Sequence, residues 1–418
     1  MAAFCFITAL LLAVSLGVHC SCPPSDRAAL LAFKAALPQR HLSVFDSWTG
    51  NDCCRNWYGV NCDQQSGRVA DISLRGDSLP SSSAASTTGS ISPQICKLTR
   101  LSSIIISDWE GLGGQIPGCI SSLVFLRIID LNGNSITGVI PADIGKLSEL
   151  IVLNLADNSI SGTIPESLTN LGNLKHLDLR NNKISGAIPR SLGKMKMVSR
   201  LLVGRNEISG DIPSSIGGVY RLVDLDLSEN KISGAIPELL SKLRVLGTVN
   251  VGGNKLRGRI PEGLLKSGIS YLNMSHNYLE GNIPDVFGGS SYFTVLDFSY
   301  NNLKGSLPRS MNSASYIGFL DVSHNHLCGS IPTGSPFDHL DDSSFLFNDC
   351  LSLHYFRLER HLPLYSFLPT TLPNNALHGP IPCRDIASPG YPHYGLALLI
   401  RGPIPESPGF GYTQVELV

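Results

Sequence analysis

Aliphatic residues recur in a fixed frame through most of this chain. The segment LIVLNLADNSISGTIP (150–165) shows the frame: leucine at 150, 153 and 155, asparagine at 158, then glycine, an aliphatic residue and proline. The L-x-L part alternates between two faces, which is the period of a short β-strand. The frame therefore predicts one short strand per unit, followed by a turn.

The asparagine of this frame returns every 23 or 24 residues, which marks an internal repeat. It is found at Asn134, Asn158, Asn182, Asn206, Asn230, Asn254, Asn277, Asn301 and Asn325. An earlier unit (101–117) has Trp109 in that place, and a still earlier one begins at Val69 and is split by SSSAASTT (81–88). About eleven units fit, and such units pack only on their neighbours. We predict an α/β solenoid, a superhelix with a parallel concave β-sheet and short 3-10 or loop segments on its convex side.

The polar and special residues of the frame have structural explanations. A buried asparagine can both donate to and accept from backbone groups, so a row of them forms a ladder between successive turns. Glycine permits the tight return, and the aliphatic residue of GxIP fills the core. Proline fixes φ and lacks an N–H, which suits a convex edge segment rather than a regular helix. The repeated GxIP motif is thus a folding element.

Charge and the amino-terminal residues indicate the compartment. The 32 basic and 33 acidic residues nearly cancel, which argues against direct nucleic-acid or anionic-membrane binding. Residues 2–18 are apolar and precede His19-Cys20-Ser21, a pattern that predicts a signal peptide over 1–20, with an uncleaved membrane anchor as the alternative. No other run approaches the ~20 apolar residues of a membrane span. We expect a secreted protein of the extracellular space or cell wall, with no membrane span in the mature chain.

Cysteine placement favours disulfides over metal binding. Nine of the eleven cysteines lie outside the predicted signal peptide, and most of them cluster near the two ends of the repeats. In a secreted chain this distribution indicates disulfides at both ends of the array. No C-x-x-C pair is present, and neither are the G-x-S-x-G, P-loop and H-E-x-x-H motifs. We therefore expect no metal, no cofactor and no catalytic residues, and we interpret His324 and His326, which flank Asn325, as exposed turn residues.

The repeat unit L-x-x-L-x-L-x-x-N-x-I-x-G-x-I-P resembles the plant extracellular leucine-rich repeat class. DCCRNWYGVNC (52–62), preceded by the helix-like SDRAALLAFKAAL (25–37), resembles the amino-terminal cap of that class. SGRVADISLRGDS (66–78), ISDWEGLGGQIP (106–117) and GSPFDHLDDSSF (334–345) are similar to the plant DNA-damage-repair/toleration leucine-rich repeat proteins, relatives of the polygalacturonase inhibitors. The resemblance covers roughly residues 22–350 and is lost after Cys350.

The resemblance implies a domain organisation and a set of disulfides. The expected parts are a signal peptide (1–20), an N-terminal cap (21–66), the repeat array (67–333), a C-terminal cap remnant (334–350) and a divergent, poorly ordered tail (351–418). The expected disulfides are Cys22–Cys53, Cys54–Cys62 and Cys328–Cys350, because the adjacent Cys53 and Cys54 should take different partners. Cys96 and Cys119 lie in neighbouring repeats and are a further candidate pair.

Outward positions of the strands supply the candidate binding residues. The middle position holds a mostly acidic or amide row, interpreted as structural: Asp130, Asn154, Asp178, Leu202, Asp226, Asn250, Asn273, Asp297 and Asp321. Two central repeats add basic side chains, so the candidate partner-binding residues are Lys175, His176, Arg180, Arg200, Arg205, Asp178 and Asp226. Arginine can grip a carboxylate with two hydrogen bonds, so this basic patch predicts a docking point for an acidic protein surface or an acidic polysaccharide; solvated charge is the alternative. The sequon Asn273-Met274-Ser275 predicts N-glycosylation at Asn273, although it lies in a strand.

The resemblance implies a secreted, non-enzymatic protein that binds a protein ligand on its concave face in plant defence or at the cell wall. By analogy with polygalacturonase inhibitors, the partner would be a microbial wall-degrading enzyme, or alternatively a receptor ectodomain. A soluble co-receptor or decoy in cell-surface signalling is a second interpretation. A DNA-damage tolerance role, which the family name suggests, is a third, and the charge balance argues against direct DNA contact.

Overall fold

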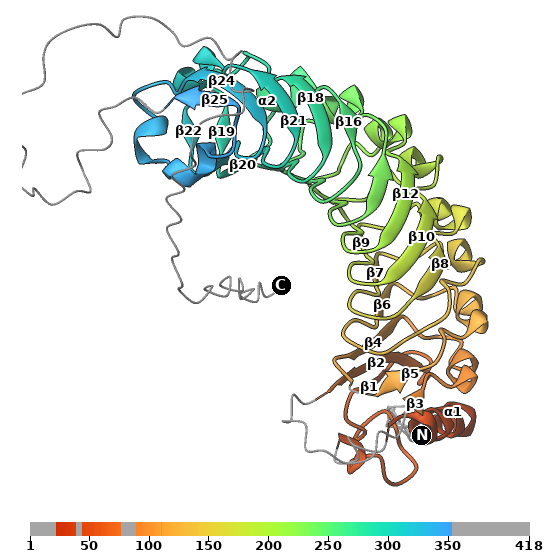
Figure 1. Cartoon of the computed structure of the whole chain (residues 1–418). Helices are drawn as coiled ribbons and strands as arrows, with labels where there is room; N and C mark the ends of the chain where they lie inside the picture. Colours follow the sequence, from red (N-terminus) through yellow and green to blue (C-terminus); the bar gives the residue numbers. More distant parts are fainter. Residues whose placement is uncertain (1–21, 39–43, 77–88, 110, 353–418) are drawn as a thin grey trace, which may run out of the picture. The chain divides into compact units, whose positions relative to one another are not determined.

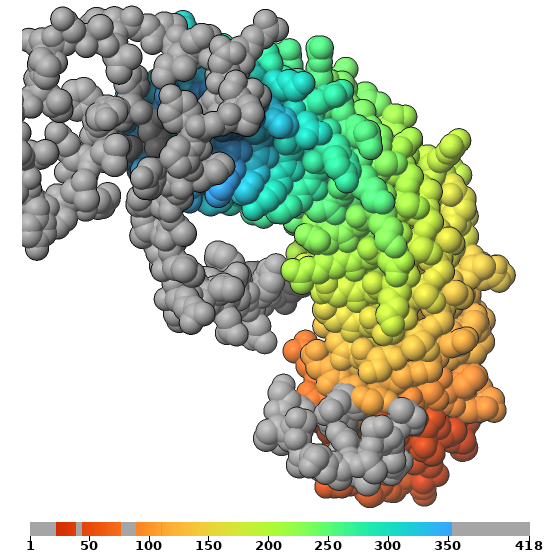
Figure 2. Space-filling model, in the orientation of Figure 1, coloured from red at the N-terminus to blue at the C-terminus, as the bar shows by residue number. Residues whose placement is uncertain are grey.

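A curved stack of repeats makes up the part of the chain that the computed structural model describes, which is residues 22–38, 44–76, 89–109 and 111–352 (Figure 1). The predicted signal peptide (1–20), the inserted SSSAASTT (81–88) and residues 353–418 lie outside the described residues. Each repeat contacts chiefly the one before and the one after, and the colours of Figure 2 therefore change in order along the stack.

The inner side of the curve is a single 12-stranded sheet, here called the concave sheet. Its strands pair in parallel from β2 onward, one per repeat, while β1 runs antiparallel to β2. In order, they are β1 (Val60–Cys62), β2 (Val69–Arg75), β4 (Ser103–Ser107), β6 (Ile128–Asp130), β7 (Val152–Asn154), β9 (His176–Asp178), β11 (Arg200–Leu202), β13 (Asp224–Asp226), β15 (Thr248–Asn250), β17 (Tyr271–Asn273), β20 (Val295–Asp297) and β23 (Leu320–Asp321). This arrangement confirms the predicted solenoid with a parallel sheet.

Short strands and 3-10 turns form the rest of each repeat. The strands are β3 (Gly89–Ser90) with β5 (Leu112–Gly113); β8 (Ser161–Thr163), β10 (Lys183–Ala187), β12 (Glu207–Asp211) and β14 (Lys231–Ser233); β16 (Arg257–Gly258), β18 (Tyr278–Asn282), β21 (Asn302–Gly305), β24 (His326–Ser330) and β25 (Cys350–Ser352); and β19 (Tyr292–Phe293) with β22 (Tyr316–Ile317). The 3-10 helices are η2 (Pro93–Lys97), η3 (Gly118–Ser122), η4 (Ile144–Lys146), η5 (Glu166–Asn170), η6 (Leu192–Lys194), η7 (Ser214–Gly218), η8 (Glu238–Lys242), η9 (Arg309–Ser313), η10 (Phe337–His339) and η11 (Asp342–Phe345), and one repeat has the short α-helix α2 (Glu262–Lys266) instead. In most repeats the GxIP proline immediately precedes the helix, as Pro165 does for η5, so its missing N–H is no loss.

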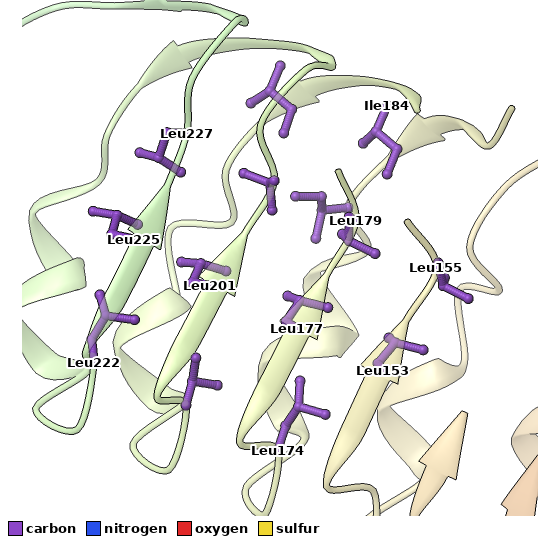
Figure 3. Packing of buried hydrophobic residues seen from close by; sticks show 14 of the residues in the cluster. Leu153, Leu155, Leu174, Leu177, Leu179, Ile184, Leu201, Leu222, Leu225 and Leu227 are labelled. Atoms are coloured by element: carbon purple, nitrogen blue, oxygen red, sulfur yellow. The ribbon is translucent and has the colours of Figure 1, made fainter. Parts of the chain in front are cut away.

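Leucines fill the space between the concave sheet and the convex segments. Leu177, Leu201 and Leu225 occupy the same place in successive strands and are at most 3% exposed (Figure 3). Fully burying one such side chain contributes about 1.5–3 kcal/mol, so each repeat is stabilised mainly by the row it shares with its neighbours.

The frame asparagines form the predicted ladder. Asn158 is typical: its Nδ2 donates to the carbonyls of Leu131 (2.9 Å), Leu155 (3.2 Å) and Ala156 (2.9 Å), and its Oδ1 accepts from the N–H of Ile136 (2.9 Å). Two of these partners belong to the preceding repeat, so each asparagine joins two turns.

The ladder extends one step beyond the predicted array. Asn348 donates to the Val322 carbonyl (3.0 Å) and accepts from the N–H of Leu327 (3.0 Å), as the asparagines before it do. It lies 23 residues after Asn325, a spacing already present between Asn254 and Asn277, so the signal was in the sequence. The ordered repeat therefore reaches β25, two residues past the expected cap boundary at 350.

The N-terminal cap closes the first repeat. Helix α1 (Pro24–Ala36) packs beside η2 and buries Leu30 and Phe33 in the continuous core. Asp26, which is fully buried, accepts two hydrogen bonds from the Arg68 guanidinium (3.0 and 2.8 Å) and one from the N–H of Val69 (3.1 Å). This ion pair ties α1 to β2.

Four disulfides brace the two ends. They join Cys22 to Cys53, Cys54 to Cys62, Cys96 to Cys119 and Cys328 to Cys350. The same pairs are expected from the sequence, and Cys383 lies outside the described residues. Within the described ranges, no helix has the length and apolar character needed to cross a membrane.

Candidate functional site

Solvent-facing side chains of the concave sheet form the candidate site, and its central row has a structural role. Oδ1 of Asp226 accepts from the N–H of Ser228 (3.0 Å), two residues further on, and also from the Ser228 hydroxyl (2.6 Å). Asp297 makes the same contacts with Ser299, and the amide of Asn273 makes them with Ser275. The polar members of the row thus satisfy backbone N–H groups where their strands end, in agreement with the structural interpretation, and Leu202 is the exception.

Two of the predicted basic residues are already paired with carboxylates. The Arg180 guanidinium binds both oxygens of Asp178, with Nη2 2.7 Å from Oδ2 and Nε 3.0 Å from Oδ1. Arg200 Nε lies 3.2 Å from Asp224 Oδ2, an ion pair that does not reach hydrogen-bond geometry. Within the predicted patch, Arg180 is thus paired with a carboxylate of its own repeat and Arg200 with one of the next repeat, and the role of the patch in docking stays a prediction.

His176 is a neutral member of this region. It lies beside Arg200 across the β9–β11 pair, and its Nε2 is buried without a hydrogen-bond partner among the described residues. Burial, and secondarily the positive charge of Arg200, lower the pKa of His176. The imidazole therefore resists protonation and adds little to a positive patch.

Lys175 and Arg205 are the cations of the predicted patch that remain available. Both side chains are exposed, and neither makes an ion pair within the described ranges. Arg205 immediately precedes Asn206 and has a positive φ of 54°. The docking capacity for an acidic group thus rests on these two residues.

The sequon asparagine lies on the same sheet. Asn273 ends β17, between β15 and β20, and its Oδ1 accepts from the hydroxyl of Ser275 (2.8 Å), the third residue of the sequon. A glycan here would project from the concave surface. Glycosylation of Asn273 stays a prediction.

A column of stacked rings is the feature that the sequence analysis missed. In every repeat the residue before the ladder asparagine, here called the turn residue, has a positive φ. In the last four repeats these residues are His276, Tyr300, His324 and Phe347, and their ring centroids lie 4.1, 3.9 and 4.3 Å apart in sequence order. The interplanar angles are 11°, 13° and 17°, so the rings are nearly parallel. His324 is therefore part of a stack rather than a simple exposed turn residue, while exposed His326 contacts Asp349 (3.0 Å).

An open groove lies beside the first repeats, with a volume of about 800 Å³. Its lining includes Arg100, Phe125, Arg127 and Glu149, and the Arg100 guanidinium lies 4.7 Å from the centre of the Phe125 ring. The mixed charges and the stacked arginine give this groove no single chemical preference.

Comparison with protein-family models matches three stretches of the chain. A leucine rich repeat N-terminal domain covers residues 23–63, a leucine-rich repeat region covers 119–267, and a further leucine rich repeat covers 268–290. The first agrees with the cap described above, and the other two lie within the array.

Known proteins with similar sequences come from plants. The chain is 52% identical over 125 residues to the DNA damage-repair/toleration protein DRT100 of Arabidopsis thaliana, a match that covers 28% of this chain and 33% of that protein. It is 32% identical over 135 residues to polygalacturonase inhibitor 1 of Oryza sativa subsp. japonica, covering 31% of this chain and 38% of the inhibitor. The chain thus matches only 33% and 38% of the length of these two relatives.

Two solved structures with the same fold are also plant proteins. A plant ice-binding protein is 28% identical with a TM-score of 0.61, and the match covers 79% of this chain and 96% of that one. The ectodomain of the receptor kinase GASSHO1/SCHENGEN3 from Arabidopsis thaliana, in complex with CASPARIAN STRIP INTEGRITY FACTOR 2, is 31% identical with a TM-score of 0.65, covering 78% of this chain and 38% of that one. These matches agree with the repeat frame, the N-terminal cap and the asparagine ladder described above. The chain belongs to the plant leucine-rich repeat proteins.

Proposed function

We propose that this chain is a secreted, non-catalytic protein that recognises another protein on its concave sheet, as a polygalacturonase inhibitor does, in plant defence or at the cell wall. The observation that supports this most directly is the surface itself. Twelve strands at about 4.8 Å spacing present a face about 50 Å long, which exceeds the width of a standard protein interface. The four disulfides favour an oxidising, extracellular compartment.

The partner would be a microbial wall-degrading enzyme, by analogy with the polygalacturonase inhibitors of Oryza sativa and Vitis vinifera. An acidic group on that enzyme, or on wall polysaccharide held with it, would contact Lys175 and Arg205. Such exposed contacts weaken with added salt, unlike the apolar core.

The test is an inhibition assay of the purified full chain against a panel of microbial polygalacturonases. We expect inhibition of at least one enzyme, reduced by added salt and by the double variant Lys175→Glu/Arg205→Glu. Arg200 is left unchanged, because a glutamate there would face Asp224 and weaken the sheet. The matched control is Lys194→Glu/Lys242→Glu, which changes two exposed lysines of the convex turns η6 and η8 that make no ion pair among the described residues. Failure to inhibit any enzyme of the panel would count against this partner class.

A soluble co-receptor or decoy in cell-surface signalling is the second candidate. It is favoured by the structural match to the GASSHO1/SCHENGEN3 ectodomain. Calorimetric titration with synthetic CASPARIAN STRIP INTEGRITY FACTOR 2 separates the candidates, since a decoy would bind it and an enzyme inhibitor would not.

A further inference from the structure

The turn conformation of the stacked residues does not require aromatic side chains. Gly133 and Gly253 occupy the same position in other repeats, with φ of 67° and 66°, and glycine adopts this conformation without steric cost. Bulky residues adopt it rarely, yet Tyr300 has φ 53° and Phe347 has φ 58°. The turn therefore does not select for rings, and their stacking is an additional feature of the last four repeats. Strained residues of this kind cluster at ligand-binding and active sites.

A second pair of rings lies at the opposite ends of the same strands. Tyr292 and Tyr316 each come just before a concave strand, and their ring centroids are 5.0 Å apart in a stacked arrangement. They are 52% and 43% exposed. Phe319, the residue directly before β23, is 44% exposed. The last repeats thus present aromatic rings at both edges of the concave sheet.

Carboxylates lie between the two sets of rings. Asp297 and Asp321 are direct neighbours across the β20–β23 pair, and both are half-buried. The concave segments 247–253, 270–276, 294–300 and 318–324 contain no lysine or arginine, so the histidines of the ring stack, His276 and His324, are the only side chains of these segments that can carry a positive charge. Burial, and more weakly the charge of Asp297, raise the pKa of Asp321, which indicates that the carboxylate lacks full compensation. The central repeats differ, because there Arg180 and Arg200 compensate Asp178 and Asp224.

We propose that this aromatic–acidic surface, formed by the stacked turn residues, Tyr292, Tyr316, Phe319, Asp297 and Asp321, binds a lysine- or arginine-bearing segment of a protein partner. The cation would be attracted to the two carboxylates and to the ring of Phe319, which no other described ring covers, and the apolar part of the segment would cover the exposed edges of the stacked rings. The proposal rests on the proposed function only in treating the concave sheet as a recognition surface.

The size of the surface favours a polypeptide over a small cation. From Tyr316 to His324 the chain advances eight residues, or about 25 Å, and four strands span about 15 Å in the other direction. An area of this size is about half of one partner's share of a standard interface, which leaves room for further contacts. Arg205 lies about 20 Å from β20, four strand spacings along the sheet, and Lys175 lies one spacing further. A partner would therefore present an acidic group near β11 and a basic group near β20.

The probe is a library of short random peptides displayed on phage and selected on the immobilised full chain. Selected peptides are resynthesised, and their affinity is measured by fluorescence anisotropy at low and high salt. We expect enrichment of lysine or arginine next to aliphatic or aromatic residues. The chain is used after enzymatic deglycosylation, because the Asn273 sequon lies on the same surface.

Two variants remove the proposed contacts with little structural cost. Asp297→Asn/Asp321→Asn keeps the hydrogen-bond acceptor, as Asn273 does in the same row. Tyr300→Gly removes one ring and keeps the positive φ, as Gly253 does. We expect each variant to lower the affinity for the selected cationic peptides by about tenfold. The matched controls Asp130→Asn and Glu229→Gly make the same kinds of change in other repeats and should leave affinity unaltered.

Three outcomes would overturn the proposal. The selected peptides could lack lysine and arginine, the cationic peptides could bind all variants equally well, or the control variants could lose as much peptide affinity as the test variants. Melting curves exclude unfolding as the cause of any loss. Binding of cationic peptides without inhibition of any polygalacturonase would reject the enzyme partner and keep this inference. If polygalacturonase inhibition is unaffected by Asp297→Asn/Asp321→Asn and Tyr300→Gly, and no peptide binds, this inference is rejected and the enzyme partner is kept.

Discussion

At the residue scale, a single amide per repeat joins neighbouring turns, and its chemistry leaves little freedom for replacement. Asn206 is 8% exposed, and its Nδ2 donates to three carbonyls, those of Leu179, Val203 and Gly204, at 2.9–3.2 Å. A carboxylate at this position would face three acceptors with no proton to share. The ladder could be predicted from sequence because the amide has to satisfy both donors and acceptors.

Asn206→Asp is expected to lower the free energy of unfolding by about 3–5 kcal/mol, because a buried charge would be left unpaired. Urea unfolding followed by circular dichroism measures the change. The control is Asn173→Asp, an exposed asparagine with one hydrogen bond to the Ser148 carbonyl, where a change of less than about 1 kcal/mol is expected. Equal losses in the two variants would contradict the assigned role of the ladder.

Asp130 gives a pH-dependent prediction. Its burial raises the pKa of the carboxyl group above its ordinary value. The native state therefore favours the protonated form, so the contribution of this group to stability is present below the unfolded-state pKa and is lost as pH rises through the folded-state pKa. Asp130→Asn should raise the melting temperature at neutral pH and have no such effect in acid.

The replacement is well accommodated, because Asn154 holds the equivalent position in the next strand. Melting curves across pH measure the effect. The reverse variant Asn154→Asp should be destabilising at neutral pH and should recover in acid. A gain for Asp130→Asn that persists unchanged in acid would show that the charge is not responsible.

At the element scale, strand positions and the convex turns follow from the sequence, whereas the state of the outward side chains does not. The alternation of Leu153 and Leu155 fixes which face is buried, so the sheet could be predicted. The Arg180–Asp178 and Arg200–Asp224 pairs depend on side-chain conformations, so the strand pattern alone does not reveal which cations of the predicted patch are paired. The ring stack needs the turn residues of successive repeats to be parallel and within about 4 Å of one another, which only the repeat geometry reveals.

The ion pair between Asp26 and Arg68, which ties the N-terminal cap to the first repeat, gives the prediction at this scale. Arg68→Met would leave the fully buried Asp26 without its partner, and we expect a loss of about 3–5 kcal/mol in unfolding free energy. Urea unfolding and limited proteolysis of the cap measure it. Arg55→Met, which breaks the exposed contact with Asp52, should cost less than about 1 kcal/mol. A negligible effect of Arg68→Met would mean that α1 is held by its apolar face alone.

At the scale of the whole array, stability is a sum of repeats and their interfaces, so a local change should have a local effect. This arrangement also explains how the concave sheet can combine different chemistry in one surface. The central repeats pair their charges internally, while the last repeats leave carboxylates and rings available, and neither region alters the core of the other. The expected partner sites are therefore separable by mutation.

The C-terminal disulfide tests this locality. Cys328 and Cys350 join β24 to β25 and enclose Phe347 and Asn348, the last ring of the stack and the last asparagine of the ladder. The double variant Cys328→Ser/Cys350→Ser should cost about 2–4 kcal/mol in the repeats that it closes. Hydrogen exchange read by mass spectrometry should become faster over residues 302–352 and stay unchanged over 150–206. The mirror variant Cys96→Ser/Cys119→Ser should affect the first repeats and leave the aromatic–acidic surface intact. Faster exchange along the entire array in either variant would show that the repeats unfold as one unit, and the two binding regions would then not be independent.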